Sequence, residues 1–224
     1  MFKKMLVTMA TAAACLAGAL PAQASPTSLF DADYPAAGGV SDTPLVYGNR
    51  FTMTSTIIAT ALGLFDRNSD GFFESHQVGL MSAAGTLLAS VSFGPGQAGT
   101  LGPGVKPGDN SLPNSGMRYL DIADVQLEAG QSYWLAALFP APMSDFVGLG
   151  RHVSSAYASG FTGGYSYGSI LTPTSNVIDG YVIGVNLLTA DAAAPVDNTV
   201  PEPATLIQVL TLLGALALVR RSRA

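Results

Sequence analysis

Glycine and proline interrupt the middle of this chain so often that they leave little room for helices. The 224 residues include 25 glycines and 14 prolines, and residues 94–116 alone hold 11 of them among 23 positions. Between these breaks stand short runs rich in Val, Ile, Thr, Phe and Tyr, which favour strands. Residues 25–199 are therefore expected to form an all-β domain, a single antiparallel β-sandwich or jelly-roll-like fold.

Six segments have the composition and length of strands. They are residues 50–64, 77–81, 86–93, 117–122, 132–139 and 181–188. Residues 94–116 are expected to form a long surface loop, and residues 140–176 a second irregular region. The domain is predicted to cover residues 25–188. The Ala, Asp and Pro content of residues 189–199 indicates a linker.

Residues 1–24 have the three parts of a secretory signal peptide. Two lysines precede an apolar run over residues 5–20, and Ala22 and Ala24 form the small-x-small pattern after which signal peptidase cleaves. The signal helix is expected to be removed, together with Cys15, the only cysteine. The exported chain then has no disulfide and no cysteine ligand for a metal.

The C-terminal segment joins a Pro-Glu-Pro motif to an apolar stretch and an arginine cluster. Its parts are Pro201, Glu202 and Pro203, then residues 204–219, then Arg220, Arg221 and Arg223. A helix over residues 204–219 is about 24 Å long and crosses a hydrocarbon core of about 30 Å only if the arginines snorkel and the bilayer thins. The arginines belong in the cytoplasm by the positive-inside rule, which leaves the domain outside the inner membrane.

These C-terminal residues resemble the PEP-CTERM sorting signal of exported proteins from Gram-negative bacteria. The resemblance implies that a membrane-embedded exosortase recognises residues 201–203 and removes the transmembrane helix. The precursor would lie in the inner membrane through residues 204–219, with its domain in the periplasm. The product would then reach the cell surface or the exopolysaccharide matrix of a biofilm. A plain single-pass tail anchor is the alternative interpretation.

Several fragments of the domain resemble a β-sandwich family of unknown function that recurs in exported bacterial proteins. The fragments are residues 28–30, 40–43, 47–51, 61–66, 75–80, 85–90, 118–119 and 127–133. The resemblance implies a non-catalytic surface or adhesive domain and supplies no active site.

The domain is strongly acidic. Residues 25–199 contain 14 acidic and 5 basic side chains, hence a net charge of −9. Nucleic-acid binding depends on a basic patch, so we expect no nucleic-acid partner.

Residues 66–74 have the pattern of a calcium-binding loop. The oxygen ligands would come from Asp66, Asn68, Asp70, the carbonyl of Phe72, and Glu74. The twelfth position of the pattern holds Gln77 instead of the glutamate of an EF-hand. A plain turn rich in Asp and Gly is therefore the alternative. His76 is expected to pack or to hydrogen-bond within the sandwich and not to bind zinc, because His152 is the only other histidine.

Aromatic residues suggest a second kind of site. Trp134 lies in a nearly continuous apolar run and is expected to pack in the core. The aromatic cluster of Tyr157, Phe161, Tyr165 and Tyr167 lies among glycines and serines, so its members are candidates for contact with glycan. We assign no catalytic residue and expect no enzyme. The leading hypothesis is a structural or adhesive surface protein, and a carbohydrate-binding module of the exopolysaccharide matrix is the alternative; a hydrolase ranks third.

Overall fold

The computed structural model describes residues 26–38, 41–106, 111–142, 145–178 and 180–191, and these residues form strands and connecting segments with no helix. The strands are β1 (Thr27–Ser28), β2 (Asp31–Gly38), β3 (Leu45–Met53), β4 (Ile57–Asp66), β5 (His76–Ser82), β6 (Leu87–Phe93), β7 (Thr100–Gly102), β8 (Gly116–Leu127), β9 (Ser132–Phe139), β10 (Val147–Ser154), β11 (Ala158–Tyr167), β12 (Asn176–Val177), β13 (Val182–Ile183) and β14 (Val185–Asp191). The all-β prediction is confirmed. Within these ranges, no helix has the length and apolar character needed to cross a membrane.

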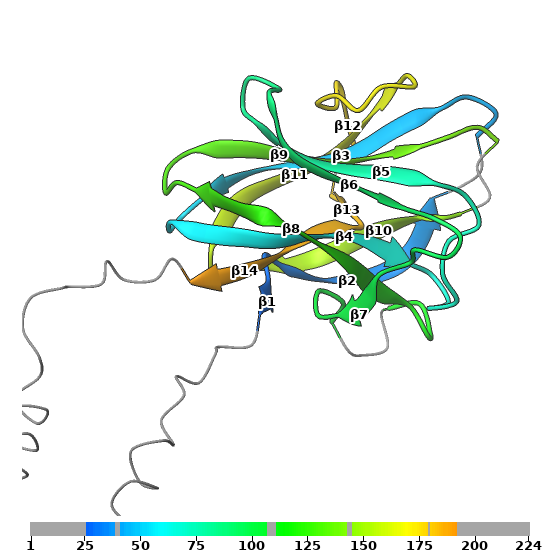
Figure 1. Cartoon of the computed structure of the whole chain (residues 1–224), viewed down its shortest axis with the longest axis horizontal. Coiled ribbons are helices and arrows are strands. Elements are labelled where there is room, and N and C mark those ends of the chain that lie inside the picture. The colour runs from blue at the N-terminus through cyan, green and yellow to red at the C-terminus, as the bar shows by residue number, and fades with distance from the viewer. Residues whose placement is uncertain (1–25, 39–40, 107–110, 143–144, 179, 192–224) are drawn as a thin grey trace, which may run out of the picture. The chain divides into compact units, whose positions relative to one another are not determined.

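The strands form two layers that enclose one core (Figure 1). One layer is a six-stranded sheet in the order β12-β11-β3-β9-β5-β6. The other layer contains a five-stranded sheet, β1-β14-β4-β8-β7, and a three-stranded sheet, β13-β10-β2. The ladders between these strands are antiparallel. This arrangement is that of a β-sandwich.

The core follows the alternation of side chains along each strand. In β9, Tyr133, Leu135 and Phe139 are buried in the main core. Trp134, between them, packs instead in a smaller cluster with Val46, Met81, Ala136, Leu138 and Leu171. The expectation that Trp134 packs in the core is confirmed only for this smaller cluster, because a continuous apolar run hides the alternation between the two faces of a strand.

Close backbone contacts join the two sheets of the second layer. Gly184 lies between β13 and β14, donates to the carbonyl of Gly148 and accepts from the backbone N–H of Phe65, both at 2.8 Å. A Cβ atom at Gly184 would lie 2.5 Å from the Cβ of Phe65, and one at Gly148 would lie 2.6 Å from the Phe65 ring. Only glycine leaves room for the Phe65 ring where the chain passes from one sheet to the other.

A single buried amide connects the two layers across the core. Asn49 on β3 is fully buried, and its Nδ2 donates to the carbonyls of Ile183 at 2.9 Å and Val185 at 3.4 Å. Its Oδ1 accepts from the backbone N–H of Ile183 at 2.7 Å. Asn49 thus satisfies backbone groups of β13 and of β14, which the ladders leave open at this point.

The two ends of the described domain lie on the same edge. Strand β1 pairs with β14, with Thr27 opposite Thr189 and Ser28 opposite Leu188. The hydroxyl of Thr189 lies 3.2 Å from the hydroxyl of Thr27. The last strand runs to Asp191. It therefore extends into the predicted linker over residues 189–199 and corrects the predicted domain end at residue 188.

Several strand predictions are confirmed with small changes of their ends, but the single strand over residues 50–64 was wrong. The chain leaves the six-stranded sheet after Met53 and enters the five-stranded sheet at Ile57. The turn between them contains no Gly or Pro. Hydrogen bonds of the Thr56 hydroxyl stabilise this turn instead. The hydroxyl donates to the Glu128 carboxylate at 3.2 Å and accepts from the backbone N–H of Ala129 at 3.1 Å.

The prediction of irregular structure over residues 140–176 was also wrong, because β10 and β11 lie there. The glycines in β11 do not break the strand. They let neighbouring backbone segments approach closely, because they have no side chain. A Cβ atom at Gly163 would lie 2.4 Å from the Tyr181 carbonyl oxygen, and one at Gly164 would lie 2.4 Å from that of Asn176. The predicted loop over residues 94–116 contains the short strand β7. The signal peptide and the C-terminal tag lie outside the described residues.

Replacement of Asn49 by alanine is expected to destabilise the full chain by about 3 kcal/mol, because the N–H and C=O of Ile183 lose their buried partner. Urea unfolding followed by tryptophan fluorescence measures this difference. Asn176→Ala, which removes an exposed amide on β12, is the matched control and should change stability by less than about 1 kcal/mol. Equal effects of the two variants would contradict the role given to Asn49.

Candidate functional site

The loop between β4 and β5 closes on Asp66. This residue ends β4, and its buried Oδ2 accepts from the backbone N–H of Gly71 at 2.9 Å and from Nε of Arg118 at 2.5 Å. Arg118 also donates through Nη2 to the carbonyl of Ser69 at 2.7 Å. Gly71 has φ of +100°, which suits glycine. Asp66 therefore closes a turn and neutralises an arginine, which agrees with the turn interpretation of this loop.

The other predicted calcium ligands lie in different surroundings. Asn68 and Asp70 are exposed. The side chain of Phe72 turns into the core, with its ring 5.4 Å from that of Phe93. Glu74 joins a different group, with His76 and Asp145. Among the Asp, Glu, His and Cys side chains that the structure describes, this is the group of three whose ligand atoms approach one another closely.

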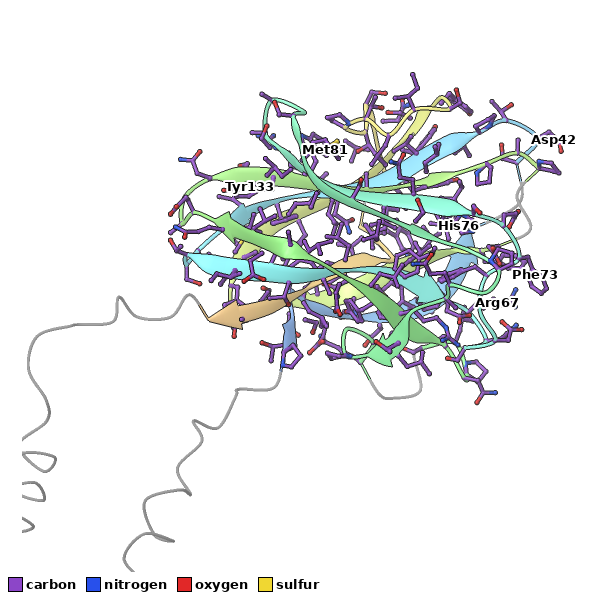
Figure 2. All side chains as sticks on the ribbon, viewed as in Figure 1. Asp42, Arg67, Phe73, His76, Met81 and Tyr133 are labelled. Atoms are coloured by element: carbon purple, nitrogen blue, oxygen red, sulfur yellow. The ribbon has the colours of Figure 1, made fainter. Side chains whose placement is uncertain are left out.

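Glu74, His76 and Asp145 form what we call the end cluster. One ligand atom from each lies within 4.8 Å of the other two. Nε2 of His76 is 2.7 Å from Oδ2 of Asp145 and 3.9 Å from Oε2 of Glu74. His76 begins β5 in the six-stranded sheet, whereas Asp145 lies just before β10 in the other layer. Figure 2 shows His76 toward the same end of the sandwich as Phe73 and Arg67, away from Tyr133.

Backbone groups hold both carboxylates of the end cluster. Oδ2 of Asp145 accepts from the N–H groups of Phe73 at 2.9 Å and Glu74 at 3.1 Å. In return, the N–H of Asp145 donates to Oε2 of Glu74 at 3.0 Å. This reciprocal pairing fixes the segment before β5 against the segment before β10.

His76 itself is fully buried and held by aromatic rings. Its ring lies 4.6 Å from that of Phe139 and 5.6 Å from that of Phe72. The expectation that His76 packs and hydrogen-bonds within the sandwich is confirmed. Nδ1 has no hydrogen-bond partner in the described part of the chain. The neutral tautomer with hydrogen on Nε2 therefore suits the bond to Asp145 and leaves Nδ1 as a bare acceptor.

The surroundings of Asp145 change its acidity. Burial by itself would raise the pKa of this carboxyl, but the hydrogen bonds from His76 and from the backbone N–H of Glu74 outweigh it. The net result is a pKa below the ordinary value of 3.8. Asp145 is therefore ionised throughout the physiological pH range.

The predicted aromatic cluster lies on β11 and just before it, not in a loop. The ring of Phe161 packs 4.9 Å from Phe30 and 5.8 Å from Phe51, and Tyr157 is half-buried against the same core. Tyr165 stands 5.7 Å from Tyr167, edge to face. Tyr167 is 68% exposed. Tyr157, Phe161 and Tyr165 pack partly against the main core, whereas Tyr167 is exposed, and contact of these residues with glycan stays a prediction.

Residues 164–168 read Gly-Tyr-Ser-Tyr-Gly, the spacing of a nucleophile elbow. That motif needs a sharp turn from a strand into a helix, and Ser166 lies instead within β11. Its buried hydroxyl accepts from the backbone N–H of Ser175 at 2.7 Å. Ser166 therefore holds the following segment against the sheet and has the environment of a structural residue.

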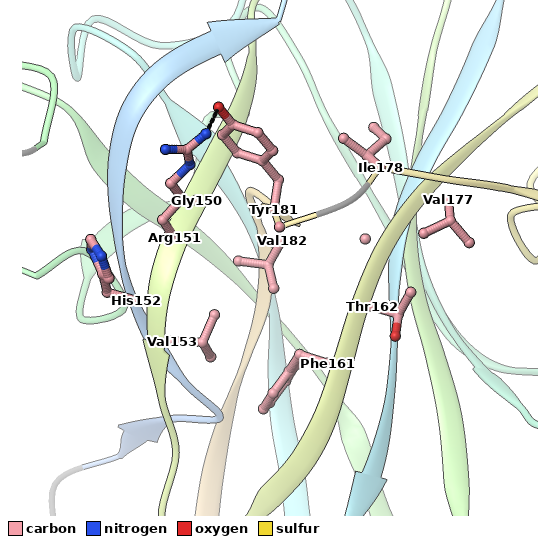
Figure 3. A pocket seen from close by; sticks show the side chains of 12 residues that line it. Gly150, Arg151, His152, Val153, Phe161, Thr162, Val177, Ile178, Tyr181 and Val182 are labelled. Atoms are coloured by element: carbon pink, nitrogen blue, oxygen red, sulfur yellow. Dashed lines mark hydrogen bonds between the residues drawn. The ribbon is translucent and has the colours of Figure 1, made fainter.

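A cavity of about 310 Å³ opens between β10 and β11 (Figure 3). Its lining includes Phe161, Val182, Thr162 and Arg151. The guanidinium of Arg151 lies 4.2 Å from the centre of the Tyr181 ring and donates to the Tyr181 hydroxyl. Apolar side chains, a hydroxyl and a cation thus line the same cavity.

No protein-family model and no curated protein matches this sequence. Functional proposals for this chain therefore rest on its own residues and their geometry.

Sequence reasoning recognised Glu74 as an acidic ligand and His76 as a buried residue, but it did not join them, and it missed Asp145. The alternation of Glu74 and His76 just before an apolar strand is the only local signal. Asp145 stands 69 residues after His76, so only the pairing of distant strands brings it to the cluster.

The lowered pKa of Asp145 predicts a loss of stability in acid. A carboxyl with a lowered folded-state pKa stabilises the fold above its unfolded pKa, and this contribution disappears as the pH falls through the folded value. Asp145→Asn should therefore cost about 1–3 kcal/mol at neutral pH and progressively less below about pH 4. Urea unfolding across this pH range, in EDTA, measures the difference. Asp121→Asn, at an exposed position of β8, is the control. A cost for Asp145→Asn that does not change with pH would contradict the assignment.

Proposed function

We propose that this protein is an exported structural or adhesive protein of the cell surface or the exopolysaccharide matrix, whose C-terminal tag is processed by exosortase. Signal cleavage after Ala24 exports the chain, and residues 204–219 hold the precursor in the inner membrane. Processing at residues 201–203 then releases the β-sandwich domain from the periplasmic face of that membrane. The proposal includes no catalytic activity of the domain itself.

The pairing of β1 with β14 is the observation that best supports this proposal. Thr27 stands just after the predicted signal cleavage site, and its partner Thr189 stands just before the tag. Both ends of the domain thus leave from one edge of one sheet. Signal cleavage after Ala24 therefore leaves β1 in its sheet. The proposal is that the other sheet edges of the domain stay available outside the membrane, as display on the cell surface requires.

Glu202 is the residue on which release should depend. The sequence predicts an extended Glu202, because proline restricts its own φ and disfavours the helical region for the residue before it. Glu202→Ala should leave the protein full length and in the membrane fraction, with release reduced at least about tenfold, a loss of about 1.4 kcal/mol of recognition. Intact mass spectrometry of membrane and extracellular fractions measures this outcome.

The control for Glu202→Ala is Glu128→Ala, at an exposed position beside β8, which should be processed normally. Cells without exosortase should accumulate the same full-length species as the Glu202→Ala strain. Normal processing of Glu202→Ala would contradict the role of Glu202, and normal processing without exosortase would contradict the role of exosortase.

The cavity between β10 and β11 favours a second candidate function, binding of an acidic polysaccharide. Arg151 and Lys106 both lie near this cavity, Lys106 through its bond to the carbonyl of His152. In a domain with a net charge of −9, one of the five cations thus lines this cavity, and a second bonds to the backbone of a lining residue. A carboxylate of a uronic acid would bind the guanidinium, and the apolar face of a sugar would lie against Phe161.

Arg151→Ala should weaken binding of an oligogalacturonate at least about tenfold, because it removes a charged hydrogen-bond donor. Isothermal titration calorimetry of the full chain in detergent measures this change. Arg67→Ala is the matched control, since Arg67 also lies over an aromatic ring, 4.4 Å from the centre of Phe146, and does not line the cavity. If Tyr165→Ala and Tyr167→Ala abolish binding while Arg151→Ala does not, the glycan site is this pair of tyrosines and not the cavity.

A further inference from the structure

We propose that Glu74, His76 and Asp145 form a binding site for a divalent transition metal of the zinc class. The site is independent of the sorting tag and of the polysaccharide cavity. It takes one imidazole nitrogen and two carboxylate oxygens as ligands, and it joins the two layers of the sandwich at one end.

The separations of the ligand atoms suit a metal ion. Ligands about 2.1 Å from a tetrahedral zinc ion stand about 3.4 Å from each other. Nε2 of His76 is 2.7 Å from the Asp145 oxygen and 3.9 Å from the Glu74 oxygen. These two distances lie on either side of the ideal value. Side-chain shifts of less than about 1 Å therefore produce the metal geometry.

The ligands are held in place before the metal arrives. Two backbone N–H groups orient the Asp145 carboxylate, one orients that of Glu74, and two aromatic rings enclose His76. Such outer contacts reduce the conformational entropy that metal binding costs, and they position ligands as the second shell of a metal site does.

Electrostatics also favour a cation here. Two carboxylate oxygens lie within 4.8 Å of each other, a distance at which like charges repel strongly in a partly buried place. A divalent ion between them converts this repulsion into attraction. Metal binding at Nε2 of the neutral His76 ring requires the ring hydrogen to lie on Nδ1, so the change of tautomer releases no net proton.

The ligand types select the class of metal. Calcium takes oxygen ligands, six to eight of them, whereas zinc accepts imidazole nitrogen together with carboxylate oxygen. The side chains of Glu74 and Asp145 keep 18% and 10% of their exposure. Solvent therefore reaches the cluster and can supply a water molecule as the fourth ligand.

One feature limits the affinity. A histidine that binds metal usually donates its other ring N–H to an acceptor, and the loss of such a partner weakens binding about 10–100-fold. Nδ1 of His76 has no such partner among the described residues. We therefore expect micromolar affinity, suited to a metal that is taken up outside the cytoplasm and stabilises the domain.

The test uses the untagged full chain, purified in detergent and treated with EDTA, and titrated with zinc chloride by calorimetry near neutral pH. One zinc ion should bind per chain, and the thermal unfolding temperature should rise. Glu74→Gln and Asp145→Asn each keep the shape of a ligand and remove its charge. Each should weaken zinc binding at least about tenfold. Asp70→Asn, on the exposed neighbouring loop, should leave it unchanged.

Metal-free thermal unfolding of each variant confirms that it folds before its zinc affinity is compared. Absence of zinc binding to the folded wild-type chain would overturn the proposal. So would zinc binding that survives in both Glu74→Gln and Asp145→Asn. A calcium titration completes the test, because binding of calcium alone, lost in Asp70→Asn, would move the site to the Asp66 loop and refute the end cluster.

Discussion

The fold depends on one buried amide that connects the two layers of the sandwich. Hydrophobic packing between sheets is non-directional and does not by itself select one alignment of the layers. Asn49 adds direction, because its carboxamide both donates to and accepts from the backbone of Ile183. Any sliding of one layer over the other would leave these groups buried without partners. The alignment of β3 with β13 and β14 is thereby set.

This alignment also determines where functional groups meet. His76 belongs to the six-stranded sheet and Asp145 to the segment that enters the three-stranded sheet, so the end cluster exists only when the layers are in register. Gly184 also contributes to this alignment. Because glycine has no side chain, Phe65 fits against the chain where β13 continues as β14. The same continuation brings β14 next to β1 and places both ends of the domain on one edge.

Much of the fold could be predicted from local patterns in the sequence. Residues 132–139 are a nearly continuous apolar run with three aromatic residues, and they form β9 as expected. The turn at residues 54–56 could not be predicted, because hydroxyl groups and contacts with distant segments stabilise it without Gly or Pro. Strand β11 was hidden for the opposite reason. Its glycines resemble strand breaks in the sequence, but they allow neighbouring backbone segments to approach within van der Waals distance.

The sequence by itself determined the all-β class, the acidic charge, and the pattern on which the export and sorting proposal rests, because these follow from composition and from contiguous motifs. It also marked Glu74 and His76 as polar residues beside an apolar strand. Only the tertiary structure decided that Asp66 pairs with Arg118, that Phe161 packs against the core while Tyr167 is exposed, and that Asp145 joins Glu74 and His76. These contacts link residues far apart in the chain, and their partners are selected by strand register and layer alignment, which no local pattern contains.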